Sequence, residues 1–471
     1  MTVPTTVDAP YSPQGIFSPQ YRTATSGILL TITLIAFEGM SIGAAMPAIS
    51  TDLQAIDLYG WSFSAFLMAG LFVTVMAGQW SDRRGPALPF LLGVAVFVAG
   101  MIMAGAAANK GMFIAARAVQ GFGGGAVIVA CYVMIARVYR PDARPKIFAA
   151  LSSAWVVPAL IGPSVGGLVA GTVGWRWVFF GIVPLVIPAL LMLLPALRAK
   201  KDEPKAAADP GDAGGAAPVR RGGPVVMTLS AAGAAVGAGV LLYGVGDLHL
   251  HLPIGLAACA VGLVLLGLSL PRLLPTGSLR LRRGLPTTVV MRGLLSGPFF
   301  CVNSFIPLML QEVRGFSDAA AGVALTTGAL GWSAGAYLQS RGFVRRERLI
   351  MFGAVAVTAG IALTALAVSP AVPGWVAVPA WVVAGFGMGM GVSSVNVTTM
   401  AQSSDAEQGA NSASLQVTDT LGASLAIGFG GALINFVGHD DIATGFVTVS
   451  AVMAVLGIFA AIVAGRVRVR T

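Results

Sequence analysis

Long apolar segments separated by short polar loops fill almost the whole chain, and this pattern predicts a bundle of membrane helices. A helix crosses the hydrocarbon of a bilayer with roughly 20 apolar residues. Fourteen segments come close to or exceed that length: 26–49, 61–80, 87–108, 111–136, 147–171, 177–197, 225–246, 253–270, 286–310, 319–340, 349–369, 375–400, 412–436 and 443–465. The pattern therefore predicts an all-α polytopic membrane protein.

The spacing of these segments divides the chain into six, two and six helices. We expect a disordered cytoplasmic tail, a six-helix bundle, a charged linker rich in Ala, Gly and Pro, two inserted transmembrane helices, a basic cytoplasmic loop and a second six-helix bundle, at residues 1–25, 26–197, 198–224, 225–271, 272–285 and 286–471. Transporters are often built from such repeated halves, with the substrate site between them near the bilayer midplane.

The charge distribution predicts the orientation of the chain. Only 10% of the residues are charged and 56% are hydrophobic, which leaves too little polar surface for a soluble globule. An even number of crossings places both termini on one side, and that side carries 24 of the 29 Lys and Arg residues. The positive-inside rule then places both termini in the cytoplasm. The net charge of +10 is interpreted as a topology signal, and no nucleic-acid partner is expected.

The residues that could support metal binding or enzyme chemistry are few. Cys131, Cys259 and Cys301 fall within apolar segments and are interpreted as small apolar residues. His249 and His251 form only a weak metal signal in a loop. No phosphate-binding loop or Ser/His/acid set is found. We therefore expect no enzyme activity, no metal and no cofactor.

Two clusters of glycine, proline and charged residues stand in the first bundle. The first, at the end of segment 61–80, consists of Gly78, Asp82, Arg83 and Gly85. A helix N-terminus carries about half a positive charge, so the start of segment 412–436, near the candidate N-caps Asn411 and Ser412, is a possible partner for Asp82. The second cluster lies in segment 147–171, where prolines kink the helix and glycines permit close packing; it consists of Pro158, Gly162, Pro163, Gly166 and Gly167.

With these motifs the chain resembles the major facilitator superfamily, and within it the fourteen-span drug:proton antiporters. The superfamily loop motif G-x-x-x-D-R-x-G matches the first cluster, and the fourth-span motif R-x-x-Q-G matches Arg117, Gln120 and Gly121. The second cluster matches the antiporter motif G-x-x-x-G-P-x-x-G-G, with Pro158 in place of its first glycine. The resemblance implies the major facilitator fold and an exporter, with these residues in gating and in the conformational cycle.

Glu38, in the middle of the first segment, is the candidate proton-binding residue. An acid inside a membrane helix is costly and usually serves an ion or substrate path. At 1.5 Å per residue, Glu38 lies roughly 18 Å from the start of its segment and Arg117 roughly 9 Å from the start of its own, which places both at a similar height in the bilayer. We expect Glu38 to bind and release the coupled proton while Arg117 adjusts its proton affinity. The alternative is a static buried ion pair.

The same arithmetic pairs Asp419 with Arg292 in the second bundle, roughly 11 Å and 9 Å from the same side. They could form a second proton-coupling site or a structural bridge, or Asp419 could attract a cationic substrate. The polar and aromatic residues expected to line the substrate cavity are Gln120, Arg292, Asn303, Trp332 and Gln416, and Trp381 could also stack on a planar substrate.

The sequence thus predicts a proton-coupled antiporter that exports a hydrophobic or amphipathic drug-like compound across the bacterial inner membrane. Its partners would be the substrate, protons and membrane lipids, and a monomer is expected. One alternative is an exporter of a lipid or an endogenous metabolite with the same fold. Another is a membrane sensor or scaffold without transport.

Overall fold

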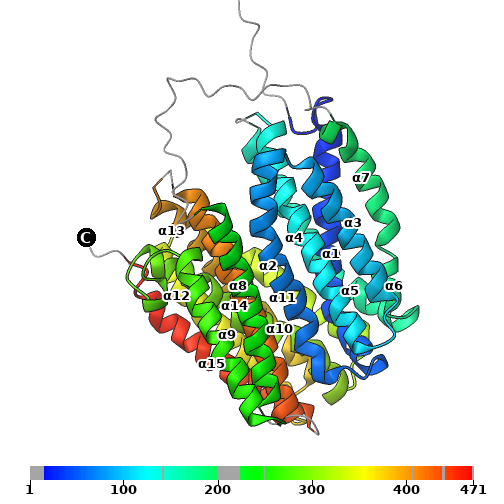
Figure 1. The fold of residues 1–471 in the computed structure, drawn as a ribbon. Coiled ribbons are helices and arrows are strands. Elements are labelled where there is room, and N and C mark those ends of the chain that lie inside the picture. The colour runs from blue at the N-terminus through cyan, green and yellow to red at the C-terminus, as the bar shows by residue number, and fades with distance from the viewer. Residues whose placement is uncertain are drawn as a thin grey trace, which may run out of the picture.

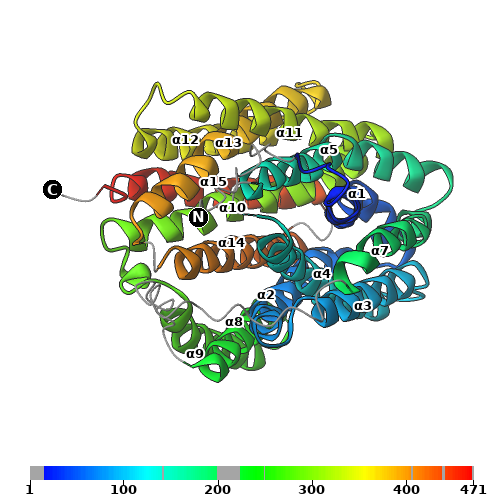
Figure 2. The same ribbon diagram turned by 90° about the horizontal axis from the view of Figure 1, so that it is seen from above.

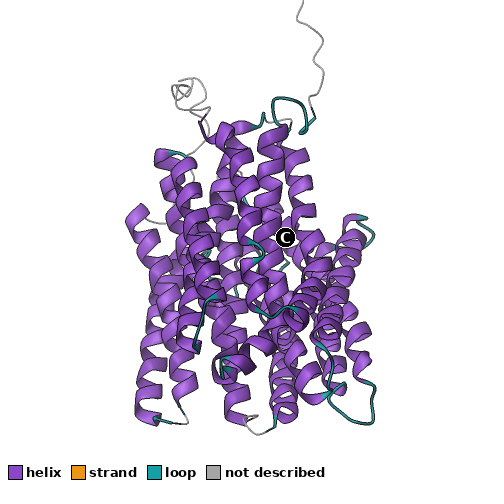
Figure 3. Ribbon diagram, turned by 90° about the vertical axis from the view of Figure 1, so that its right-hand side faces the viewer, coloured by secondary structure: helices purple, strands orange, loops and turns teal. Residues whose placement is uncertain are grey.

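The computed structural model describes residues 15–140, 143–198, 223–248, 250–404, 407–437 and 441–468. Within these ranges the chain consists of helices joined by loops, without a strand, as Figure 3 shows. The predicted all-α fold class is therefore confirmed. Most of the expected tail and linker, His249 and the side chain of Asp82 lie outside the described residues.

The first bundle contains helices at all six predicted spans. They are α1 (Arg22–Asp52), α2 (Tyr59–Arg84), α3 (Ala87–Gly105), α4 (Lys110–Val138), α5 (Arg144–Thr172), α6 (Arg176–Phe180) and α7 (Val183–Arg198). The sixth span is divided into α6 and α7, because Pro184 has no amide hydrogen to donate to the carbonyl of Phe180.

The inserted pair and the second bundle complete the chain. They comprise α8 (Pro224–Asp247), α9 (Leu252–Leu273), α10 (Leu285–Leu308) with its π-helical continuation Met309–Val313, α11 (Asp318–Ser340), α12 (Arg346–Leu366), α13 (Ala377–Ala401), α14 (Gln408–Val437) and α15 (Ile442–Ala464). Local capping sets some of these starts. The Ser317 hydroxyl, for example, accepts a hydrogen bond from the amide of Ala320 (3.3 Å) and begins α11.

Thirteen helical segments of the described chain are long and apolar enough to cross a membrane. The remaining predicted span corresponds to α11, which has 23 residues and is richer in polar and small side chains. The composition of α11 follows from its packing against α13. A Cβ at Gly331 or Gly335 would overlap a backbone carbonyl of α13, and Gly385 and Gly389 of α13 meet the carbonyls of α11 in the same way.

Two ends of the molecule are used as reference below. The basic end is where α1 begins and α2 ends, beside Arg83 and Arg84. The acidic end is where α1 ends and α2 begins, beside Asp52 and Asp57. Figure 1 shows the first bundle, in blue and cyan, beside the second bundle, in yellow to red.

The two bundles touch along two helix pairs, which we call the α2–α14 seam and the α5–α11 seam. In the α2–α14 seam, Ser64 Oγ donates to the carbonyl of Ser424 (2.8 Å), and Gly60 packs on Gly431. In the α5–α11 seam, the hydroxyls of Ser164 and Thr326 are hydrogen-bonded (3.0 Å). These contacts lie in the half of the molecule nearer the acidic end. Seen from above in Figure 2, the two seams lie on opposite sides of the central helices α1 and α10.

Candidate functional site

Glu38 of α1 lies in a fully buried polar cluster with Arg117 and Gln120 of α4. Arg117 Nη1 donates to Glu38 Oε1 (2.5 Å) and to Gln120 Oε1 (2.7 Å). Gln120 Nε2 also donates to Glu38 Oε1 (3.2 Å). Glu38 is 0% exposed and Arg117 only 2%. The structure thus brings together an acid and a base that the sequence separates by 79 residues.

The guanidinium of Arg117 has further contacts with α2. Its Nε donates to the carbonyl of Ser62 (3.2 Å), and its Cζ lies 4.6 Å from the centre of the Phe66 ring. A cation over an aromatic face is stabilised by the ring quadrupole. Arg117 therefore keeps partners on α2 and α4 that do not depend on the charge of Glu38.

The second carboxylate oxygen of Glu38 is different. Oε2 is buried and accepts no hydrogen bond from the described residues. A buried polar atom left without a partner costs about 1–3 kcal/mol. The protonated form of a carboxylic acid carries its hydrogen on one oxygen only, so Oε2 is the atom on which a proton can be placed without breaking the bonds to Oε1.

The motif in α5 holds α1 in place around Glu38. Ser41 Oγ donates to the carbonyl of Gly162 (3.0 Å), and a Cβ built on Gly166 would lie only 2.5 Å from the carbonyl oxygen of Ser41. A Cβ built on Gly162 would lie 3.0 Å from the Cβ of Met40. The two glycines therefore let α5 lie directly against α1, one turn away from the buried acid.

The other motif residues of α5 reach the second bundle. A Cβ on Gly167 would overlap the carbonyl of Asp318, and the carbonyl of Pro163 lies against Gly322 of α11. Pro158 is buried within the same helix. One helix thus touches both the helix that carries Glu38 and the opposite bundle.

The motif at the end of α2 forms a turn. Gly85 caps α2 with φ +87°, a conformation that favours glycine. Gly78 is half-buried, and Arg83 is exposed. The suggestion that Asn411 and Ser412 cap the facing helix was wrong, because α14 begins at Gln408 and includes both residues.

A second copy of this turn escaped the sequence analysis. Gly335, Gln339 and Gly342 at the end of α11 repeat the spacing of Gly78, Asp82 and Gly85. Gly342 also has positive φ (+70°). The repeated interval of seven residues between the two glycines was the signal for it. In this copy glutamine replaces the acid.

Asp419 of α14 and Arg292 of α10 form a second ion pair. Arg292 Nε donates to Asp419 Oδ1 (2.8 Å) and Nη2 donates to Oδ2 (3.1 Å), which is the bidentate geometry of a strong pair. The Ser296 hydroxyl also donates to Asp419 Oδ1. Both charged side chains are 17% exposed, so this pair is more open than the one at Glu38.

The remaining residues expected in the cavity are distributed over three environments. Gln120 has no exposed surface and belongs to the Glu38 cluster. Asn303 is half-buried, and its Oδ1 accepts a hydrogen bond from Trp381 Nε1 (3.0 Å). Trp332 is half-buried, and Gln416 is exposed and donates to Thr420 Oγ1 (3.2 Å).

An aromatic group surrounds these tryptophans. The ring of Phe299 stacks on Trp381 (centroids 4.9 Å apart) and meets Trp332 edge-on (5.7 Å). Phe300 also faces Trp332 (6.3 Å). The sequence analysis missed both phenylalanines, although their position next to Asn303 in one helix was a usable signal.

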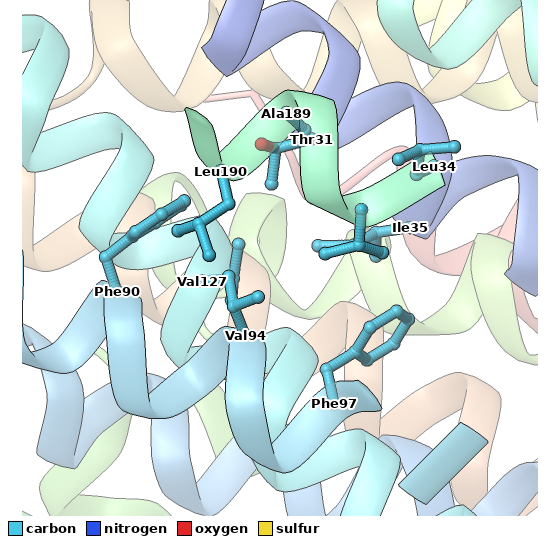
Figure 4. Close-up of a pocket in the computed structure, with 10 residues that line it drawn as sticks. Thr31, Leu34, Ile35, Phe90, Val94, Phe97, Val127, Ala189 and Leu190 are labelled. Atoms are coloured by element: carbon cyan, nitrogen blue, oxygen red, sulfur yellow. The ribbon is translucent and has the colours of Figure 1, made fainter. Parts of the chain in front are cut away.

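Two cavities lie among the described residues, and neither has the size, lining and position expected of a transport site. The first, in Figure 4, lies within the first bundle between Thr31, Phe90, Val127 and Leu190 and measures about 20 Å³. It has room for little more than a water molecule, and its lining is apolar. The second, about 590 Å³, lies at the basic end beside Arg345 and Arg346 and is lined by the second bundle alone. Neither lies between the bundles.

Residues 28–427 match the Major Facilitator Superfamily. The match covers most of the chain, and the chain belongs to this superfamily of membrane transporters. It is a multi-pass membrane protein, as the apolar helices indicated, and its relatives and fold are those of transporters rather than enzymes.

Several relatives are named for transport or for multidrug resistance. Multidrug resistance protein 3 of Bacillus subtilis (strain 168) is 24% identical over 379 residues, which are 79% of this chain and 72% of that protein. Multidrug transporter protein MdtP of the same strain is 26% identical over 176 residues, or 37% of this chain and 32% of that protein. An Acurin A biosynthesis cluster MFS-type transporter of Aspergillus aculeatus is 30% identical over 165 residues, or 35% and 30%. The chain thus matches about a third of the length of these last two.

Solved structures share the fold. A bacterial homologue of the human lysosomal transporter Spinster, in an inward-facing and unoccupied conformation, superposes with a TM-score of 0.66 at 15% identity, over 95% of this chain and 97% of that one. An auto-inhibited peptide transporter of the POT family gives a TM-score of 0.66 at 15% identity, over 94% and 98%. At this identity the likeness concerns the fold alone.

Proposed function

We propose that this protein is a proton-coupled antiporter that exports a hydrophobic or amphipathic compound across the bacterial inner membrane. The proposal rests on Glu38, a buried carboxylate in the first bundle that is paired through one oxygen and unpaired at the other. Proton relays in transporters use acids inside the membrane in this way. The proton is the coupling ion, and no other cofactor takes part.

The cluster supplies a simple switch. In the charged state, Glu38 Oε1 accepts bonds from Arg117 and Gln120. A proton on Oε2 neutralises the acid and weakens its attraction for Arg117, since charge-assisted hydrogen bonds are the stronger ones. Arg117 then keeps its hydrogen bond to the carbonyl of Ser62 and its contact with the Phe66 ring, both on α2. Protonation thus shifts the contacts of Arg117 from α1 toward α2. Helix α2 in turn forms one of the two seams between the bundles.

The charge distribution supports an orientation with the basic end in the cytoplasm. In this orientation the seam contacts at Ser64 and Ser164 close the side away from the cytoplasm. The faces of α14 and α11 toward the basic end are exposed at Gln416 and Ser333. A substrate from the cytoplasmic side would therefore meet the space between the bundles first.

The substrate class is inferred from the relatives and from the second bundle. Two relatives are named for multidrug transport or resistance. In this chain, Trp332 with Phe299 and Phe300 offers an aromatic surface, and Asp419 offers a partly exposed carboxylate. Aromatic faces and an acid together suit planar cationic compounds.

The test is efflux of a fluorescent cationic dye from a pump-deficient bacterium that expresses the full chain. Wild type should extrude the dye, and an uncoupler should stop it. Glu38→Gln, which mimics the protonated acid, should abolish uphill efflux but keep exchange of labelled for unlabelled dye. Glu312→Gln is the matched control and should behave as wild type, because Glu312 is an exposed acid in the π-helical continuation of α10.

Uphill, uncoupler-sensitive efflux by Glu38→Gln would contradict the proposal. If wild type moves none of a broad panel of dyes and drugs yet exports a lipid or a metabolite, the alternative substrate class is correct.

A further inference from the structure

The inserted helices α8 and α9 contact both halves of the protein at one of the two seams. Near the basic end, Gln79 Nε2 of α2 donates to the carbonyl of Pro224 (3.0 Å), and Thr228 Oγ1 donates to Gln79 Oε1 (3.2 Å). On the other bundle, Ser414 Oγ of α14 donates to the carbonyl of Leu273 at the end of α9 (2.7 Å). The pair is therefore fastened to α2 on one side and to α14 on the other.

Apolar packing connects the same helices along their length. A Cβ on Gly239 of α8 would lie 3.7 Å from the sulfur of Met68, and Leu242 contacts Gly428 of α14. Buried residues of α2, α8, α9 and α14 belong to one continuous hydrophobic cluster. Figure 2 shows α8 and α9 beside α2 and α14, with α5 and α11 on the opposite side of the molecule.

The two seams can be compared at equivalent positions. Seven residues along a helix return to about the same face, two turns and about 10 Å away. Two turns toward the basic end from the Ser64–Ser424 contact stand Leu71 and Val417, which are 3% and 4% exposed. Two turns from the Ser164–Thr326 contact stand Val157, which is 50% exposed, and Ser333, which is also exposed.

The seams therefore differ in their cytoplasmic halves. The inserted pair α8 and α9 covers the α2–α14 seam. The residues of this seam toward the basic end, Leu71 and Val417, are buried. Apart from the central helix α1, which contacts both α5 and α11, no described helix packs extensively on both sides of the opposite seam, and the residues of this seam toward the basic end are accessible. An exposed valine within an apolar helix suits contact with lipid chains or with an apolar solute, not with water.

We infer that the inner half of the α5–α11 seam is a lateral entrance through which substrate dissolved in the inner leaflet reaches the space between the bundles, while α8 and α9 close the other seam. The inference rests on the proposed export function. It specifies the substrate as an amphipathic molecule delivered by the membrane, with Val157 and Ser333 on the sides of the entrance.

Transport measurements test the entrance with bulky substitutions. Val157→Trp and Ser333→Trp should each lower efflux of a membrane-partitioning cationic dye about fivefold, because a large side chain restricts access and slows productive encounter. Leu263→Trp is the matched control, since Leu263 is a 59% exposed residue on α9, at the covered seam. Efflux by Val157→Trp and Ser333→Trp that equals the control would overturn the inference and leave the antiporter proposal intact.

A second measurement does not require transport. Spin labels are attached to Ser333→Cys and to Gln416→Cys in the purified full chain in lipid nanodiscs. The half-buried Cys259 is replaced by alanine, and the buried Cys131 and Cys301 are kept. The label at residue 333 should be relaxed mainly by oxygen, which dissolves in lipid, and the label at residue 416 mainly by a water-soluble nickel chelate.

The opposite pattern, or equal lipid access at both labels, would contradict the assignment of the entrance. If wild type exports no dye, the labels still decide whether residue 333 at the α5–α11 seam faces lipid.

Discussion

The hydroxyl of Ser41 donates a hydrogen bond to the carbonyl of Gly162 (3.0 Å), so that a side chain of α1 is bonded to the backbone of α5 one turn from Glu38. Glycine makes this distance possible, because any side chain at 162 or 166 would separate the two helices. The position of the buried acid thus depends on small residues of another helix.

We predict that Gly166→Ala impairs transport. The new Cβ would lie 2.5 Å from the carbonyl oxygen of Ser41, and such overpacking costs about 1–3 kcal/mol. Dye efflux and the thermal unfolding temperature should both fall. Gly39→Ala is the control, because a Cβ there meets no atom within 4 Å although the residue is next to Glu38. Equal behaviour of the two variants would show that the α1–α5 distance is unimportant.

Replacement of Gln120 tests the role of the cluster in proton binding. Gln120→Leu removes the donor of the 3.2 Å bond to Glu38 Oε1 while keeping a similar volume. Loss of a hydrogen bond to the charged form favours the neutral form. Uphill dye efflux should therefore fall, while exchange of labelled for unlabelled dye is kept. Equal loss of both activities would instead indicate a purely structural role.

The ion pair between Arg292 and Asp419 can be assigned by a double-mutant cycle. Asp419→Asn and Arg292→Gln should each lower the free energy of unfolding by about 1–3 kcal/mol, because each leaves a charged partner without its bidentate bond. The double variant should recover part of that loss if the pair is structural. Selective loss of cationic dyes in Asp419→Asn, with neutral substrates still exported, would show instead that Asp419 binds substrate.

A disulfide should show that the bundles separate during transport. The hydroxyl oxygens of Ser164 and Thr326 are 3.0 Å apart, which is close enough for the pair Ser164→Cys and Thr326→Cys to be joined on oxidation. Oxidised protein should lose uphill efflux, and a reductant should restore it. Each single variant is a control. Full activity of the cross-linked protein would exclude opening of the α5–α11 seam at this level.

Much of this architecture follows from the apolar pattern, because a membrane helix satisfies its own backbone and leaves few alternatives. The regular rise of 1.5 Å per residue was enough to place Glu38 level with Arg117 and to relate Arg292 to Asp419. The break between α6 and α7 was not predicted, since the uninterrupted apolar character of segment 177–197 does not show how a proline divides it.

The hydrogen-bond partners of site residues were less predictable, because they depend on how each helix is rotated about its own axis. Gln120 was expected to face the substrate and instead bonds to Glu38 and Arg117. Its depth was evident from the sequence, but which side of α4 it occupies depends on the packing of α2 and α3. The start of α14 at Gln408 was missed because the polar residues before Asn411 resemble a loop.

The direct backbone contact between α11 and α13 bears on how this protein tolerates mutation. Any residue other than glycine at 331, 335, 385 or 389 would place a carbon atom inside a carbonyl group of the opposite helix. The contacts repeat along both helices, so α11 and α13 would have to move apart as whole helices to make room for a side chain. In a library of random variants selected for function, these four codons should accept the fewest changes, even though their residues carry no side chain and touch no substrate.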